Sequence, residues 1–288
     1  MPRGVRLFRY VLCLRCARYF ARAHEEGAAL RRLTTVLSLL AFASCAYADS
    51  TDSSHATRPP ADALAIFRGM SDFLAAQPRF SFRAEVSYDV LQETGEKLEF
   101  GSERSFLVRR PDRVLVAARG RDGVEERLTF DGTTLTVAVP DEGVYASVEH
   151  PGNTEAAVDF LVDEMGVMSP LGDLLHPRLA DEVASRIESS RVVGTASIRG
   201  VRCHHLAFSR SGVGFQIWVE QGERPVPVRI VVTYRDHEGS PQFSAGLAGW
   251  DFAPDVPDSA FAFAPTEAAK RVPFFELKRR IALAREGI

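Results

Sequence analysis

The spacing of apolar residues changes along the chain and separates helical from extended parts. Between Pro60 and Pro78 the apolar residues recur at helical spacing, which predicts an amphipathic helix with a wide apolar face. From residue 80 to 90 apolar and polar residues alternate, as in "FSFRAEVSYDV". This alternation predicts a strand with one buried face and one solvent-exposed face. Further strands are expected in 96–120, as two strands separated at Pro111-Asp112, in 124–139, as a pair around the turn Asp131-Gly132, and in 143–150.

A helical insert then interrupts the strands. Asn153 is a suitable N-cap for a helix that ends at Gly166, and Ser169-Pro170 begin a second short helix that ends before Pro177. Strands resume in 190–199, 201–209, 213–220, 226–234 and 241–252, and an extended segment follows over "AFAFAP".

These elements predict one α+β domain. Short connections between strands and the alternation of apolar and polar residues favour antiparallel pairing. A single sheet of about 11 strands has to curl. We therefore expect a highly curved antiparallel sheet that forms a half-open barrel. The N-terminal helix and the helical insert are the elements available to cover its concave face.

The N-terminus has the pattern of a secretory signal peptide. Arg31-Arg32 precede an apolar run over 33–43, which is shorter than the roughly 20 residues that span a bilayer. The small residues Ala46 and Ala48 suit signal peptidase, so cleavage is predicted before Asp49 and the mature protein is expected in the periplasm. Retention of the apolar run as a membrane anchor is an alternative.

A second processing site lies slightly earlier. The sequence "FASC" resembles a lipoprotein signal, in which Cys45 would be lipidated and would anchor the protein at the envelope. The expected division of the chain is a leader with a long n-region over 1–48, a disordered linker over 49–59, the sheet domain over 60–273, and a tail, helical or disordered, over 274–288.

Charge and cysteine content narrow the function classes. The first 48 residues contain eight arginines and two glutamates, so the formal charge of −3 for the whole chain leaves −9 on residues 49–288. An acidic protein without basic patches is a poor match for nucleic acid or an anionic membrane surface. Cleavage before Asp49 leaves Cys203 as the one cysteine, so no intramolecular disulfide is expected, and the pair Cys13-x-x-Cys16 is lost with the leader.

The histidine pair in "VRCHHLAF" is the first candidate for chemistry. Strand alternation points Cys203 and His205 to one face and His204 to the other, so the adjacent histidines cannot chelate one metal. No nucleophile elbow, Walker loop, dinucleotide fingerprint or His-Glu-x-x-His sequence is found, and we expect no catalysis, metal or cofactor. A hydrolase assembled from distant residues around His205 stays an alternative. Trp218 and Trp250 fit either an outer surface or a contact site.

A family resemblance supports this architecture. The order of features in "GVRCHHLAF", "FQIWVEQGERPVPVRIVVTY", "PQFSAGLAGWDFAP" and "FAFAPTEAAKRVPF", extended back to "LTFDGTTLTV", resembles a family of predicted periplasmic proteins of unknown function in the outer-membrane lipoprotein carrier (LolA-like) superfamily. The resemblance covers roughly residues 60–275. It implies a half-open antiparallel barrel around a hydrophobic cavity, covered by helices. It does not imply lipoprotein trafficking, because no partner-binding element is recognised.

The pattern and the resemblance together favour a non-catalytic binding or carrier protein for a hydrophobic, lipid-like ligand. A lipid or acylated ligand and an envelope protein are the expected partners, without nucleic acid and without a transmembrane span in the mature protein. The alternative is a sensor or interaction module that binds a protein on the curved sheet. Candidates for the ligand-contacting apolar residues, each of which also suits an ordinary core, are Phe82, Val86, Tyr88, Phe100, Phe106, Val137, Phe215, Ile217, Val228 and Ile230.

Overall fold

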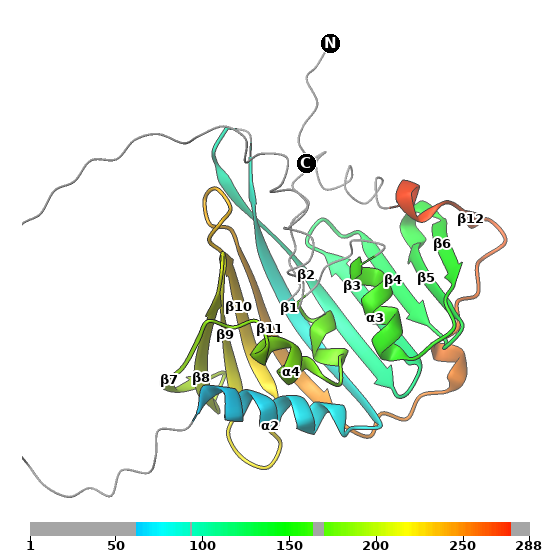
Figure 1. Cartoon of the computed structure of the whole chain (residues 1–288). Helices are drawn as coiled ribbons and strands as arrows, with labels where there is room; N and C mark the ends of the chain where they lie inside the picture. Colours follow the sequence, from blue (N-terminus) through cyan, green and yellow to red (C-terminus); the bar gives the residue numbers. More distant parts are fainter. Residues whose placement is uncertain (1–61, 93, 164–169, 278–288) are drawn as a thin grey trace, which may run out of the picture. The chain divides into compact units, whose positions relative to one another are not determined.

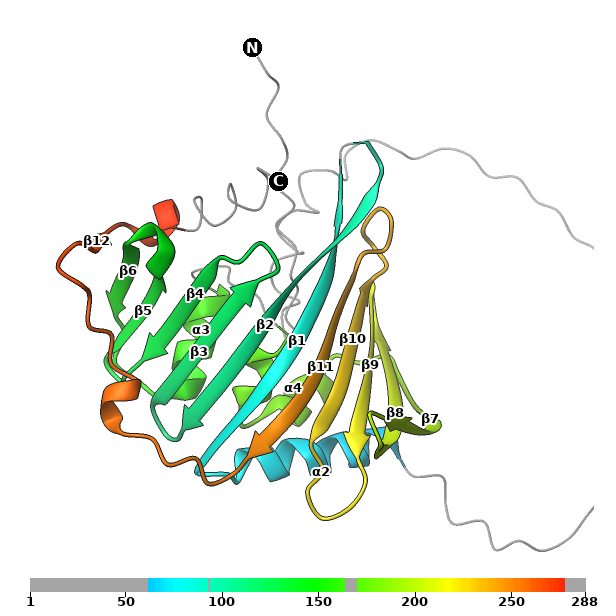
Figure 2. The ribbon, with the colours of Figure 1, turned by 180° about the vertical axis from the view of Figure 1, so that it is seen from behind.

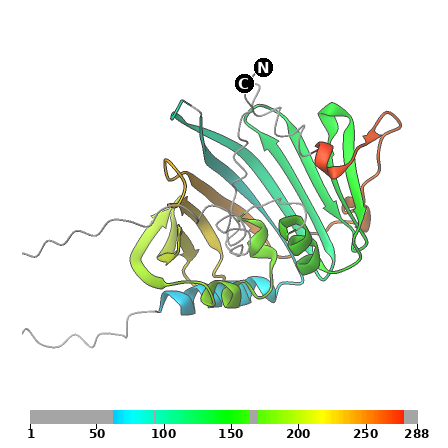
Figure 3. The same cartoon turned by 45° about the horizontal axis from the view of Figure 1, so that its top comes forward.

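The structure is a computed structural model that describes residues 62–92, 94–163 and 170–277. The expected leader, both processing sites and most of the tail lie outside the described residues. The described strands form one curved, unclosed sheet, and helices lie on its concave side (Figures 1 and 3). The α+β half-barrel expected from the sequence is therefore confirmed.

The sheet has twelve strands in the order β12-β6-β5-β4-β3-β2-β1-β11-β10-β9-β8-β7. The strands before the insert are β1 (Arg79–Leu91), β2 (Lys97–Arg109), β3 (Arg113–Gly120), β4 (Glu125–Phe130), β5 (Thr134–Val139) and β6 (Val144–Glu149). Those after it are β7 (Ser189–Ile198), β8 (Val201–Arg210), β9 (Val213–Glu220), β10 (Pro227–Tyr234), β11 (Gln242–Asp251) and β12 (Lys270–Arg271).

Most neighbours along the chain form antiparallel hairpins, and two long-range pairs, β1–β11 and β6–β12, join the strands before the insert to those after it. β1 pairs antiparallel with both β2 and β11, so the first strand lies at the centre of the sheet. The expected antiparallel pairing is correct except at one edge, where the two-residue β12 pairs parallel to β6. A strand this short contributes little alternation to the sequence, which is why the pattern did not predict it.

The N-terminal helix α2 (Ala63–Ala75) packs over β7, β8 and β9. Asp62 caps it by accepting a hydrogen bond from Leu64 N at 3.0 Å. Phe67 is fully buried, and its ring meets Phe208 edge-on at 5.3 Å and lies 6.1 Å from Phe215. Burial of this apolar face holds the helix on the sheet, as the helical spacing predicted.

The insert contains α3 (Thr154–Asp163), the 3-10 helix η2 (Gly172–Leu175) and α4 (Leu179–Ala184). The sequence predicted the first two and missed α4, a six-residue helix too short for a clear helical period. α4 binds α2 directly: Arg68 pairs with Asp181 at 2.7 Å, and the amide of Ala180 donates to Ser71 Oγ at 3.2 Å.

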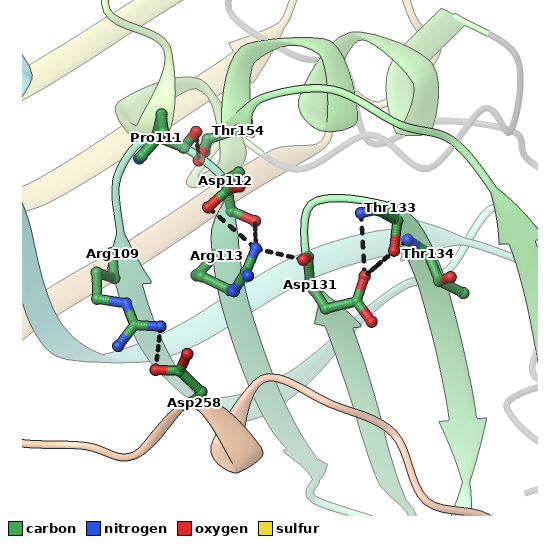
Figure 4. Close-up of polar contacts among 9 residues, drawn as sticks. All are labelled: Arg109, Pro111, Asp112, Arg113, Asp131, Thr133, Thr134, Thr154 and Asp258. Atoms are coloured by element: carbon green, nitrogen blue, oxygen red, sulfur yellow. Dashed lines mark hydrogen bonds and ion pairs between the residues drawn. The ribbon is translucent and has the colours of Figure 1, made fainter.

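The start of α3 is tied to the turns at one end of the sheet (Figure 4). The amide and the hydroxyl of Thr154 both donate to the carbonyl of Pro111, at 2.7 and 2.9 Å. Arg113 donates to the carbonyl of Asp131 and pairs with Asp112, so the β2–β3 and β4–β5 turns are joined. The base of the insert therefore has a fixed position on the sheet.

The segment between β11 and β12 passes the strand ends and covers part of the outer face (Figure 2). It contains the 3-10 helix η3 (Asp258–Ala260), and Phe261 is buried beneath the guanidinium of Arg109, 5.0 Å from its ring centroid. Arg109 also pairs with Asp258 at 2.7 Å. The stretch "AFAFAP", expected to be extended, pairs with no described strand, and its aromatic residues pack on the outer face instead.

Candidate functional site

Strand register places the sequence-predicted contact residues on one face of the sheet. Phe82 of β1 lies opposite Phe106 of β2, and the row continues through Val116 and Leu128 to Val137. On the other side of β1, the row of register partners that contains Val86 crosses β11 and reaches Ile230 and Ile217. The row that contains Tyr88 reaches Phe215 in the same way. This is the face on which α2 packs, so it is the concave face.

Burial divides these candidates into two groups. Seven are buried, which makes them part of the packed core in this structure: Phe82, Val86, Phe106, Phe215, Ile217, Val228 and Ile230. The remaining three, Tyr88, Phe100 and Val137, are half-buried. A half-buried apolar side chain on an otherwise covered face is the more suitable ligand contact, because it can lose further exposed area on binding.

The half-buried candidates belong to a larger group that we name the open patch. Tyr88 and Phe100 face each other across β1 and β2 with ring centroids 6.1 Å apart. Val116, Leu128 and Val137 are adjacent on β3, β4 and β5, and all three are half-buried. The open patch is therefore Tyr88, Phe100, Val116, Leu128 and Val137. Sequence reasoning missed Val116 and Leu128, although their alternation was visible.

The chain itself covers one end of this patch. Val137 packs against a cluster formed by Val139, Val144, Ala146 and Leu277, together with Phe274. Residues 274–277 are helical, and Leu277 is buried in this cluster. The C-terminal segment thus contacts the concave face, next to the open patch.

Trp250 is an aromatic residue whose place the sequence left undecided. A bulge places Gly249 and Trp250 opposite the single residue Phe82, and Gly249 has a φ of +66°, which suits glycine. The bulge turns the indole onto Phe82, with ring centroids 4.4 Å apart, and its N–H donates to Pro227 O at 3.2 Å. Trp250 therefore belongs to the concave face, and only a bulge, which strict alternation does not indicate, puts it there.

The histidine pair has no catalytic geometry. His205 stacks on Trp218 at 4.1 Å, and its Nε2 lies 2.9 Å from Gln216 Oε1, so this nitrogen donates to an amide oxygen. His204 contacts Gln221 instead, so the two rings point apart as expected. Cys203 is buried, and burial is the main cause that raises the pKa of its thiol, with the Glu220 carboxylate adding to it. A thiol that resists ionisation is a poor nucleophile.

The structure brings together a second polar group that the sequence did not indicate. One ligand-type atom from each of Glu155, Asp159 and His176 lies within 4.8 Å of the others. The amide of Arg178 donates to His176 Nδ1 at 3.2 Å, so the proton of the neutral ring is on Nε2, which faces Glu155 at 3.1 Å. Arg178 binds the same carboxylate at 2.8 Å. A metal would have to displace this proton and this cation, so the geometry favours a structural role in holding α3 to η2.

The fold and this face define a class of protein: an open, curved and almost entirely antiparallel sheet with a largely apolar concave face, partly covered by helices. The chain matches the family described as "Predicted periplasmic protein (DUF2092)" over residues 63–275, and it belongs to that family. The family indicated by the resemblance is therefore confirmed.

Several solved structures are similar in fold. They include the Mycobacterium tuberculosis lipoprotein LppX, at 17% identity and a TM-score of 0.42, covering 68% of this chain and 98% of that chain. The MucA/MucB complex of Pseudomonas aeruginosa gives 15% identity and a TM-score of 0.39, covering 70% and 61%. A LolA superfamily protein from Nitrosomonas europaea gives 12% identity and a TM-score of 0.32, covering 70% and 98%. Likenesses this distant transfer no ligand or partner. No curated protein is found to match the chain.

The family description gives a compartment, the periplasm. Across the ranges that the structure describes, no helix is both long enough and apolar enough to cross a membrane.

Proposed function

We propose that the protein is a periplasmic binding or carrier protein for a hydrophobic, lipid-like ligand. The observation that carries the proposal is the open patch. Five apolar side chains on the concave face stay half-buried, while the residues under α2 are fully buried. Each methylene of an acyl chain that leaves water against such a surface contributes about 0.8 kcal/mol, so a medium-length chain gives useful affinity.

The arrangement of the patch suits an extended apolar molecule. Val116, Leu128 and Val137 form a row that crosses three strands, and neighbouring strands lie about 4.8 Å apart. The stacked pair Tyr88 and Phe100 adds flat aromatic surface farther along β1 and β2. The ligand would lie across the strands on the concave side, beside α3.

The test uses the full chain, expressed with its own leader and purified without detergent. We expect native mass spectrometry to detect a co-purified lipid, and an anthroyloxy-labelled stearate to bind once that lipid is removed. Phe100→Asp places a charge in the open patch and should weaken binding at least about 10-fold, because a carboxylate disfavours apolar contact. Phe100 is only half-buried, so this variant is more suitable than a charge at a fully buried position such as Phe82.

Val193→Asp is the matched control. Val193 lies on β7, an edge strand of the sheet, and is 44% exposed, so a new carboxylate there should leave binding unaltered. Absence of binding by the wild-type protein, or an equal loss in both variants, would contradict the proposal.

A further inference from the structure

The C-terminal segment starts a helix beside the open patch. The amide of Val272 continues the pairing of β12 by donating to the carbonyl of Tyr145 at 2.8 Å, and the amide of Leu277 closes the first helical turn on the carbonyl of Pro273 at 3.0 Å. β12 is the outermost strand on this side of the sheet, whereas Leu277 already packs on β5 and β6. The segment therefore runs inward from the edge, in the direction of β4 and β3.

The sequence after Leu277 predicts that this helix continues. Residues 278–286 are "KRRIALARE", which contains neither glycine nor proline and consists mostly of strong helix formers. Gly287 follows, and a glycine at this place is typical of a helix end. These residues lie outside the described ranges, and their sequence is the basis for the expected helix. Nine further helical residues extend about 14 Å at 1.5 Å per residue.

The apolar side of the first turn continues into these residues. Leu277 follows Phe274 by three positions, and Ile281 and Ala284 follow Leu277 by four and seven. At 3.6 residues per turn these four residues share one narrow side of the helix, whereas Leu283 lies on the opposite side. Phe274 and Leu277 already pack against the cluster beside Val137. The same helix rotation therefore turns Ile281 and Ala284 toward the sheet.

The open patch has the length and the character that this side of the helix needs. Val137, Leu128 and Val116 are register partners on β5, β4 and β3, so about 10 Å separates the first from the last at the usual strand spacing. The expected helix is long enough to cross all three. Each is half-buried and still has apolar area to lose. Ile281, about 6 Å beyond Leu277 along the helix, would lie over Leu128.

The charge of the segment also favours docking. Residues 278–286 contain four basic residues and one acidic residue, so the formal charge of −9 on residues 49–288 leaves −12 on residues 49–277. A basic segment is attracted to an acidic domain. Its apolar side then determines where on the domain it packs.

We infer that residues 278–286 dock as a helix on the open patch and cover it when no ligand is bound. This inference rests on the proposed function, because the segment and the lipid-like ligand then compete for the same row of side chains. A ligand has to displace the helix. Its apparent affinity is therefore reduced by the fraction of molecules in which the patch is uncovered.

Docking is tested by a disulfide between the segment and the patch in the full-length protein. Leu128→Cys is combined with Ile281→Cys and, as the matched control, with Leu283→Cys. Mild oxidation should form the disulfide at least about 5-fold faster in the first pair, because residue 283 faces away from the sheet and a disulfide requires close Cβ atoms. Cys203 is buried and does not compete for the reaction. Equal rates in the two pairs, or no disulfide in either, would overturn the inference whatever the lipid result.

Competition is tested with the labelled stearate on the full-length protein after removal of co-purified lipid. Ile281→Asp places a charge on the docking side of the helix and should raise the affinity for the labelled stearate at least about 3-fold, because more molecules then have an uncovered patch. Leu283→Asp is the matched control and should leave the affinity unchanged. If Ile281→Asp binds no more tightly than the wild-type protein, the inference fails while the proposed function stands. If the labelled stearate binds to none of the three proteins, the proposed function fails and the competition with it.

Discussion

Asp131 shows how a single side chain shapes the turn that supports the insert. Its carboxylate accepts hydrogen bonds from the amides of Thr133 and Thr134, at 3.0 and 2.8 Å, and from the Thr133 hydroxyl at 2.9 Å. Burial alone would raise the pKa of Asp131, but these hydrogen bonds and the nearby Arg113 cation outweigh it, so the pKa is lowered. The sequence indicated the turn, but it could not show that this turn also anchors Arg113.

We expect Asp131→Ala to reduce the free energy of unfolding by about 1 kcal/mol at pH 7, because the turn amides lose their acceptor. Since the folded pKa is lowered, the stabilisation is complete above the unfolded pKa of about 3.9 and is lost as the pH falls through the folded value. Urea unfolding between pH 7 and pH 3 should show the wild-type advantage shrinking in that direction. Asp255→Ala changes an exposed carboxylate and serves as the control. An advantage that grows toward low pH would contradict this assignment.

At the scale of elements, Phe67 is one of the buried residues that hold α2 to the sheet. The ring is fully buried and touches Phe208 and Phe215 from β8 and β9. We expect Phe67→Ala to lower the free energy of unfolding by about 3–5 kcal/mol, the usual loss for a buried phenylalanine.

Phe275→Ala removes the same side chain from a position that is 79% exposed, so the change should stay within about 0.5 kcal/mol. Chemical denaturation of both variants tests the comparison. Similar losses in the two proteins would show that α2 does not depend on this contact.

Elements with a clear period could be predicted from the sequence, and elements made by long-range contacts could not. The strand around Cys203 was expected at 201–209 and is found at Val201–Arg210 because its apolar alternation is regular. The pairing of β1 with β11 and the bulge at Trp250 depend on residues far apart in the chain. For the site, alternation identified Phe100 and Val137 as facing inward. It could not show which inward residues α2 covers, and so could not separate the core from the open patch.

At the scale of the whole molecule, the signal peptide that the sequence predicts determines which residues form the mature protein. We expect intact mass analysis of protein from a bacterial envelope to give residues 49–288, carrying a formal charge of −9 and free of the membrane fraction. A mass that begins at Cys45 with added acyl chains would replace this prediction with a membrane-anchored protein. Cys45→Ser is the control, since it abolishes lipidation but leaves cleavage before Asp49 unchanged.

The central place of β1 in the sheet has a consequence for the timing of folding. If the chain is exported as its predicted signal peptide indicates, it crosses the membrane from its N-terminus, yet β1 cannot complete its pairing until β11 follows, because Ser81 lies opposite Asp251. Contacts between residues so distant in sequence fold slowly. For most of that translocation the chain would therefore present an unpaired edge of β1 and an uncovered apolar face. Its vulnerability to proteolysis and aggregation would be concentrated in that interval and would end when the last long strand arrives.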